Sequence, residues 1–168
     1  MKTLVFGAGN LLLSDEGFGV HVIRYLQEQY VFPPEVELYD GGTLGIMVAH
    51  ILEDAELVYL VDVIDAYGVP GEISRYEKVD FLSGTLPIKM SPHQIGIQEI
   101  LCLSELRERC PERITLFGII PESYEAGIEL SPTLTAKLPV LSGMLVEDLT
   151  AAGHRIVKRS VTDGPDFD

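Results

Sequence analysis

The sequence is poor in basic side chains: its 168 residues include 12 Lys and Arg against 26 Asp and Glu, a formal net charge of −14 at pH 7. This balance excludes proteins that bind nucleic acid or anionic membranes by neutralising phosphate. No Lys or Arg stands between Arg24 and Arg75, whereas ten acids do. Most of these acids are expected on a solvated surface, and a few are expected to line a site for a cation.

Cysteine and long apolar runs are also scarce. The two cysteines, Cys102 and Cys110, stand eight residues apart, which on one helix is about 12 Å of rise and too far for a disulfide. The absence of C-x-x-C excludes a zinc knuckle and a thioredoxin-like motif. No run approaches the ~20 apolar residues of a membrane span, and the opening run is too short for a signal peptide. We therefore expect a soluble, cytoplasmic protein with reduced cysteines.

Several catalytic and nucleotide-binding motifs are missing. Neither G-x-S-x-G nor H-E-x-x-H occurs, so a serine hydrolase of that type and an ordinary zincin are unsupported. Gly7 and Gly9 resemble the start of a dinucleotide fingerprint, but Leu12 occupies the position of the third glycine. Asp15 and Glu16 would repel a pyrophosphate at the helix start. A nucleotide-binding domain is therefore the weakest of the functions considered.

The apolar segments predict an α/β fold, a three-layer α/β/α domain over residues 1–159, followed by a flexible acidic tail over 160–168. The connection from the third strand to the fourth is too short for a parallel crossover, so the fourth strand should run antiparallel. The sheet should be mostly parallel, with about five strands: 3–7, 36–39, 57–61, 72–76 and 114–120. Helices are expected from Asp15, Leu44, Pro92 and Pro132, with caps at Ser14 and Thr43. Ser131-Pro132 opens the last helix, and Pro139 inside its pattern predicts either a kink or a start at that residue.

Polar residues follow the ends of the predicted parallel strands, where open α/β sheets bind ligands. Glu16, Asp40 and Asp62 follow the first three strands, and His93 begins a helix after a proline. Singly, each has a structural explanation: an acid favoured by the helix dipole, a turn residue, a strand end or a polar helix start. Two carboxylates and an imidazole together suit a borderline divalent cation. The spacing therefore favours a metal site at this edge.

Five segments together carry a resemblance to a known family. The opening segment Gly7–Val20 (GAGNLLLSDEGFGV) resembles the first motif of the [NiFe]-hydrogenase maturation endopeptidases. Later motifs of that family are similar to Asp40-Gly41-Gly42-Thr43, to Asp62 after an apolar strand, to Ser91-Pro92-His93-Gln94 with Gly96, and to Gly118–Ser123. Their order and approximate spacing match, and the resemblance extends to about residue 150.

The resemblance implies a specific function. Such endopeptidases bind the precursor of a hydrogenase large subunit after nickel insertion and remove its short C-terminal extension, a few residues past the last nickel-binding cysteine. By resemblance, Glu16, Asp62 and His93 are the metal-contacting residues, and Asp40 takes part in substrate handling and cleavage. The catalytic set is thus expected to be Asp40, Glu16, Asp62 and His93.

Two questions of mechanism and function stay open at this point. The site either holds its own ion, which would activate water, or captures the nickel already in the precursor. We favour the second, with zinc or another divalent ion able to take the place of nickel. The alternative function is a non-catalytic nickel-binding adaptor for hydrogenase assembly. The expected partner is the large-subunit precursor, with no nucleic acid or membrane involved, and a monomer is expected.

Overall fold

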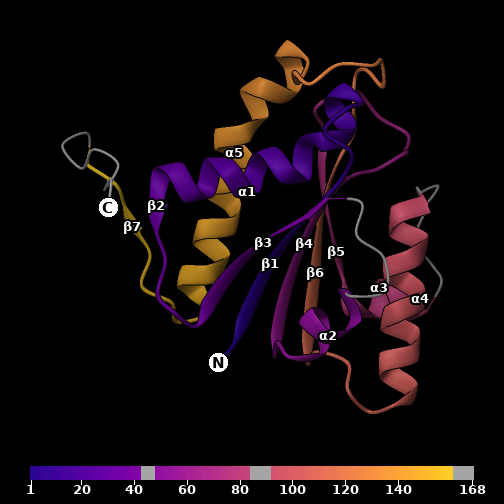
Figure 1. The fold of residues 1–168 in the computed structure, drawn as a ribbon, viewed down its shortest axis with the longest axis vertical. Helices are drawn as coiled ribbons and strands as arrows, with labels where there is room; N and C mark the ends of the chain where they lie inside the picture. Colours follow the sequence, from indigo (N-terminus) through magenta and orange to yellow (C-terminus); the bar gives the residue numbers. More distant parts are fainter. Residues whose placement is uncertain (43–47, 84–91, 161–168) are drawn as a thin grey trace.

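A five-stranded sheet forms the centre of the protein (Figure 1). The computed structural model describes residues 1–42, 48–83 and 92–160, and the backbone alone at 81 and 92–97. The strand order is β3-β1-β4-β6-β5; β5 runs antiparallel to β6, and the other pairs are parallel. The predicted sheet with one antiparallel member is therefore confirmed. Its strands are β1 (Thr3–Ala8), β3 (Val36–Gly42), β4 (Leu57–Val63), β5 (Ile73–Glu77) and β6 (Arg113–Ile119).

Helices cover both faces of this sheet (Figure 1). Helices α1 (Phe18–Gln29) and α5 (Pro132–Ala151) lie on one face, and α2 (Val48–Glu53), α3 (Lys78–Leu82) and α4 (Pro92–Leu106) lie on the other. A short 3₁₀ helix, η1 (Ser14–Gly17), precedes α1. The expected three layers are therefore present.

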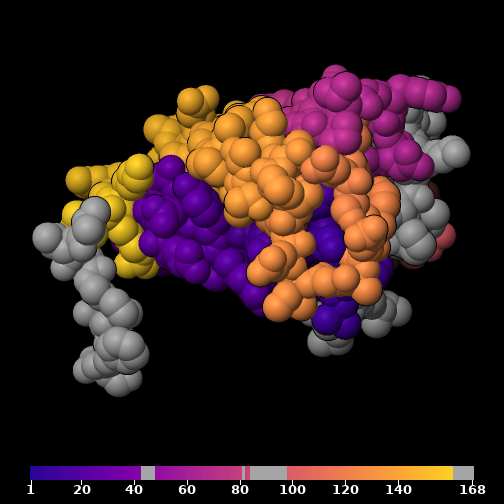
Figure 2. All heavy atoms as spheres, turned by 90° about the horizontal axis from the view of Figure 1, so that it is seen from above, coloured from indigo at the N-terminus to yellow at the C-terminus, as the bar shows by residue number. Residues whose placement is uncertain are grey.

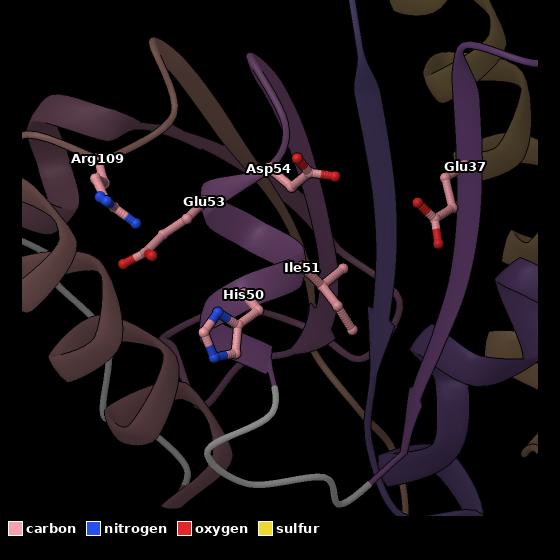
Figure 3. A pocket seen from close by; sticks show the side chains of 6 residues that line it. All are labelled: Glu37, His50, Ile51, Glu53, Asp54 and Arg109. Carbon is pink, nitrogen blue, oxygen red and sulfur yellow. The ribbon is translucent and has the colours of Figure 1, made fainter.

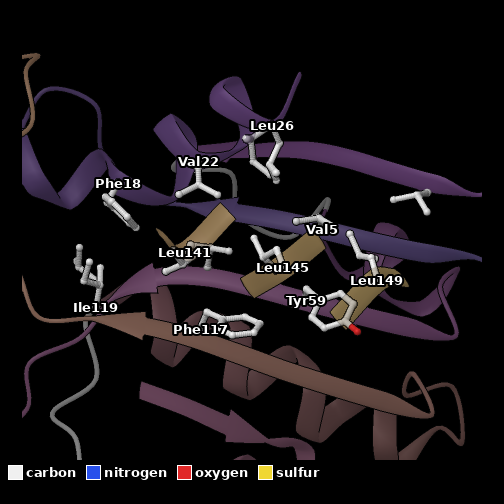
Figure 4. Close-up of a cluster of buried hydrophobic side chains, with 14 of the residues drawn as sticks. Val5, Phe18, Val22, Leu26, Tyr59, Phe117, Ile119, Leu141, Leu145 and Leu149 are labelled. Carbon is white, nitrogen blue, oxygen red and sulfur yellow. The ribbon is translucent and has the colours of Figure 1, made fainter. Parts of the chain in front are cut away.

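The alternation of side chains along the strands divides the core into two clusters. Every residue of β4 is buried: Tyr59 and Val61 face α1 and α5, whereas Val58 and Leu60 face α2 and α4. Figure 4 shows the first cluster, in which side chains of α1 and α5 meet those of the sheet. Full burial of each large apolar side chain stabilises the fold by about 1.5–3 kcal/mol, so the two clusters hold the sheet between its helices.

Helix α5 begins as the sequence predicts. The Ser131 side chain accepts a hydrogen bond from the Leu134 amide, and Pro132 occupies the first turn. Pro139 lies inside the helix, which spans 20 residues, so it does not mark the helix start. The buried residues Leu134, Leu141, Leu145 and Leu149 form the apolar face expected from their spacing.

Other local predictions were wrong or incomplete. Ser14 does not cap a helix: its φ is +49°, and its hydroxyl donates to the Glu125 carbonyl at 2.6 Å. A two-stranded ribbon of β2 (Tyr30–Val31) and β7 (Val157–Lys158) was not predicted, because two-residue strands carry no detectable periodicity. Thr43 and the tail over 161–168 lie outside the described residues.

Two expectations about the whole chain can be compared with the structure. Cys102 and Cys110 are both unbridged, as expected from their spacing. Among the described helices, none combines the length and apolarity needed to cross a bilayer.

Candidate active site

The carboxyl ends of the parallel strands meet at one edge of the sheet, at the top of Figure 1. Three described segments leave the strands at this edge: 9–17 after β1, 64–72 after β4 and 120–131 after β6. Helix α4 begins at the same edge (Figure 1). Such an edge is where open α/β sheets bind their ligands, and the predicted site residues can be located relative to it.

Glu16 is brought to this edge by a turn that closes tightly at Gly9. The Asn10 amide donates to the Glu16 carbonyl at 3.1 Å. Gly9 has φ +138°, and a Cβ there would lie only 1.9 Å from the Glu16 carbonyl oxygen. Since a side chain at position 9 would clash with backbone, glycine is required for this turn. The Glu16 side chain, in η1, is left half-buried beside the end of β1.

The neighbouring acid, Asp15, has a structural role, whereas Glu16 is a predicted site residue. Its side chain is completely buried, and its carboxylate accepts four hydrogen bonds from segment 120–131. The donors are the amides of Glu122 (2.9 Å), Ser123 (3.0 Å) and Ser131 (2.7 Å) and the Ser131 hydroxyl (2.8 Å). Asp15 therefore fastens segment 120–131 to segment 9–17.

Asp62 is the second-to-last residue of β4 and is only 2% exposed. Its Oδ1 accepts a hydrogen bond from the Val63 amide at 2.8 Å. By alternation along β4, its side chain lies on the face of Leu60 and Ile64, the face covered by α2 and α4. Burying a charged carboxylate costs folding free energy unless an opposite charge or hydrogen bonds compensate it. A carboxylate kept in such a position at a strand end is typical of a functional group.

Tyr124 lies at the same edge as Glu16 and Asp62, although no sequence motif pointed to it. Its pKa is raised by partial burial and then by the negative charges of Asp65, Glu16, Asp62 and Asp15. Four carboxylates from segments 9–17 and 64–72 and from β4 thus act on one phenol. Tyr124 lies in the segment after β6, a parallel strand that ends at this edge. The expectation that polar residues after parallel strands lie close together therefore applies to Tyr124 as well.

Asp40 lies at the same edge but on the opposite face from Asp62. In β3 it is paired with Gly7 of β1, which is itself paired with Val61 of β4. Its carboxylate lies 3.9 Å from Nη2 of Arg24 in α1, and both side chains are about half exposed. Asp40 and Asp62 therefore share one end of the sheet but stand two strands apart and on different faces.

His93 is the second residue of α4, at the start predicted for that helix, but its side chain lies outside the described part of the chain. Over the residues whose side chains are described, no three His, Cys, Asp or Glu residues are arranged to hold a metal. The predicted triad of Glu16, Asp62 and His93 therefore stays a prediction.

A pocket of about 700 Å³ lies elsewhere (Figure 3). It opens between β3, α2 and the segment after α4, and contains none of the predicted site residues. Glu53 accepts a hydrogen bond from Ser104 at 2.7 Å and pairs with Arg107; these interactions lower the pKa of its carboxyl. These contacts tie α2 to α4. The pocket is lined by Glu37, His50, Ile51, Glu53, Asp54 and Arg109.

Comparisons with known proteins converge on one family. The model of the hydrogenase maturation protease family matches residues 20–148. The chain is 33% identical over 162 residues to the hydrogenase 2 maturation protease of Escherichia coli K12, covering 95% of this chain and 97% of that protein. It is 34% identical over 158 residues to the hydrogenase expression/formation protein HupD of Rhodobacter capsulatus, covering 94% and 75% of the two chains.

A solved structure agrees with these sequence matches. The hydrogenase maturating endopeptidase HybD from Escherichia coli superposes with a TM-score of 0.88 at 31% identity, covering 95% of this chain and 98% of that one. The likeness therefore spans the sheet and the segments at its carboxyl edge. The matched range of the family model includes Asp40, Asp62 and His93, whereas Glu16 precedes it.

Proposed function

Since the chain belongs to the hydrogenase maturation protease family, we propose that it removes the C-terminal extension from the nickel-loaded precursor of a [NiFe]-hydrogenase large subunit. The chain is an endopeptidase by family; the client and the role of nickel are the proposal. The observation that supports it best is the position of Glu16 after β1 and of Asp62 near the end of β4, at the edge where α4, which carries His93, begins.

The donors proposed to contact the metal fit nickel. Glu16 and Asp62 offer carboxylate oxygens and His93 offers an imidazole nitrogen, a set that borderline divalent ions such as nickel and zinc accept. We propose that the ion is that of the precursor, so that nickel is part of the substrate. Residues that held their own ion tightly would respond poorly to nickel in a partner. Zinc or another divalent ion could occupy the same donors in its place.

Asp40 is proposed to assist the hydrolytic step. Two inter-strand spacings separate its backbone from the region of Asp62, which is roughly 10 Å. An extended peptide rises about 3.3 Å per residue, so at least about three residues are needed to pass over the end of the sheet from one carboxylate to the other, which lies on the opposite face. A peptide whose nickel ligands lie near Asp62 would then bring a bond a few residues further on to Asp40. There the Asp40 carboxylate accepts a proton from water while the oxygen of that water bonds to the carbonyl carbon. The protonated Asp40 then gives this proton to the nitrogen as the C–N bond breaks, so that the amine leaves and the carboxylate is restored.

The proposal is tested with a precursor encoded near this protein. The protein is incubated with nickel-loaded precursor and with the same precursor free of nickel, and the products are weighed by mass spectrometry. Loss of one C-terminal peptide from the nickel-loaded form alone is the expected result. An intact nickel-loaded precursor, with client and protein shown to be folded, would contradict the proposal.

Single substitutions test which of the proposed residues take part in cleavage. Glu16→Gln, Asp62→Asn, His93→Ala and Asp40→Asn are each expected to reduce cleavage at least 100-fold, a loss of about 2.7 kcal/mol of transition-state stabilisation. Glu112→Gln, an exposed acid before β6, is the matched control and should cleave normally. A site variant that processes the precursor as fast as this control would be removed from the mechanism.

Turnover separates the endopeptidase from a non-catalytic adaptor. Many precursors should be cut by each protein molecule, whereas an adaptor would form a stoichiometric complex without cutting. We further propose that the protein acts as a cytoplasmic monomer. Sedimentation at several concentrations tests the oligomeric state, and fractionation of the source cells tests the location.

A further inference from the structure

Exposed apolar side chains gather on the three segments at the carboxyl edge of the sheet. Figure 2 looks onto this edge: segment 120–131 (orange) curves around indigo atoms of the N-terminal region, with magenta atoms beside it. Five apolar side chains in these segments, which we call the apolar rim, are more than half exposed: Leu12 (66%), Tyr67 (103%), Val69 (68%), Tyr124 (52%) and Ile128 (69%).

Hydrogen bonds between the segments fix the apolar rim in place. The Gly127 amide donates to the Leu12 carbonyl at 2.9 Å and the Ser14 amide donates to the Gly127 carbonyl at 2.8 Å, so the backbone that carries Ile128 is tied to the backbone that carries Leu12. The Gly71 amide donates to the Ile120 carbonyl at 2.7 Å, which joins segment 64–72 to segment 120–131. Together with the four bonds to Asp15, these contacts fix the backbone that carries the rim. A partner would therefore meet a surface that needs little ordering on binding.

The same segments carry charge of one sign. Segments 9–17, 64–72 and 120–131 contain no Lys or Arg and seven acids: Asp15, Glu16, Asp65, Glu72, Glu122, Glu125 and Glu129. Lys137 of α5 lies beside Gly71. The ring of His21 faces the backbone of Ile128, and its pKa is lowered by burial and by Arg24, so it adds no positive charge at pH 7. A partner that fits this surface must be apolar and carry positive charge.

From this surface we propose that the apolar rim docks the face of the precursor surrounding its nickel, a protein surface with apolar side chains and net positive charge. The inference rests on the proposed function, because the rim segments leave the same edge of the sheet that carries Glu16 and Asp62, which we propose to contact nickel. The body of the precursor, and not the extension alone, then supplies most of the binding energy. Leu12 and Ile128, which are exposed on segments joined by these backbone hydrogen bonds, are the best-placed anchors.

The test uses Leu12→Ser and Ile128→Ser, with Leu106→Ser as the matched control. Leu106 is 82% exposed at the end of α4, away from the rim segments. Cleavage rates of nickel-loaded precursor are measured against its concentration. Each rim variant should raise KM about tenfold with kcat nearly unchanged, as expected for the loss of one apolar anchor. The control should leave both constants unaltered.

Salt tests the charge contribution. Raising the ionic strength from about 0.1 to about 1 M shortens the screening length from about 10 to about 3 Å. KM for the precursor should rise several-fold, whereas the ratio between Leu12→Ser and the parent should persist, because burial of an apolar side chain is not screened.

Binding measured without cleavage separates the two proposals. In the Asp40→Asn background the dissociation constant of the precursor complex should rise about tenfold with Leu12→Ser. If the parent does not cut but this shift is seen, docking stands and the proposed peptidase reaction fails. Docking is overturned if the parent cuts and the rim variants keep the parental KM. An equal rise with Leu106→Ser would overturn it as well.

Discussion

Replacing Asp15 by Asn provides a demanding test of how the edge of the sheet is held together. The two side chains have nearly the same shape, so packing is preserved while charge and one acceptor are lost. One oxygen of Asp15 accepts from Glu122, Ser123 and the Ser131 hydroxyl, and the other accepts from the Ser131 amide. In its best orientation the Asn amide keeps the first three bonds, now neutral, and its NH₂ group faces the Ser131 N–H.

The magnitude follows from these bonds. An unsatisfied buried donor costs about 1–3 kcal/mol, and each of the other three bonds weakens by about 1 kcal/mol as the acceptor loses its charge. Relief of burying the charge offsets part of this loss. We therefore expect a net destabilisation of about 2–4 kcal/mol, a large fraction of the 5–15 kcal/mol that stabilises a typical domain. At about 2–4 °C per kcal/mol for a chain of this size, Tm should fall by about 4–16 °C.

The measurement is urea and thermal unfolding followed by circular dichroism. Glu28→Gln, an exposed acid of α1, removes the same unit of charge and should change stability by less than about 0.5 kcal/mol. If Asp15→Asn lowers Tm no more than this control does, the buried carboxylate does not hold segment 120–131 in place.

Three further predictions concern other parts of the chain. At pH 8 the exposed Cys102 should be alkylated much faster than Cys110, whose pKa is raised to about 11 by burial; equal rates by peptide mass mapping would contradict this. Pro139→Ala should raise the free energy of unfolding by about 1–2 kcal/mol, because proline inside a helix forfeits a backbone hydrogen bond, and a lower urea midpoint would refute it. Gly19→Ala should cost at least about 3 kcal/mol in the same assay, because its Cβ would lie 2.4 Å from the Val61 carbonyl oxygen; a parental midpoint would show that α1 moves freely.

Much of the fold follows from local patterns. The run Leu57–Val63 is uniformly apolar up to Asp62, which predicts a strand buried on both faces, and all seven residues are buried. The short connection from β4 to β5 requires an antiparallel strand, and β5 is antiparallel. The start of α5 at Ser131 and Pro132 follows from capping chemistry. In each case the signal lies within a few neighbouring residues.

The features that escaped prediction depend on contacts between distant residues. Ser14 has the side chain of a helix cap, yet its hydroxyl is taken by the Glu125 carbonyl, 111 residues away. The role of Asp15 as a buried acceptor needs the fold of segment 120–131, which no pattern near residue 15 reveals. The opposite faces of Asp40 and Asp62 follow from the register of three strands. The sequence thus predicts which residues lie at the edge of the sheet, whereas the structure shows on which face of the sheet each side chain lies.

The meeting of α1 with α5 bears on how the protein is made. The apolar face of α1, including Val22 and Leu26, is covered partly by Leu141 and Leu145 of α5, about 120 residues later in the chain. At a synthesis rate of about 5–20 residues per second, α5 is made roughly 6–25 s after α1, and the apolar face of α1 stays uncovered during that time. A nascent chain would therefore expose the apolar face of α1 to solvent for longer than most folding steps take. We expect its yield to depend on chaperones that shield apolar helices during translation.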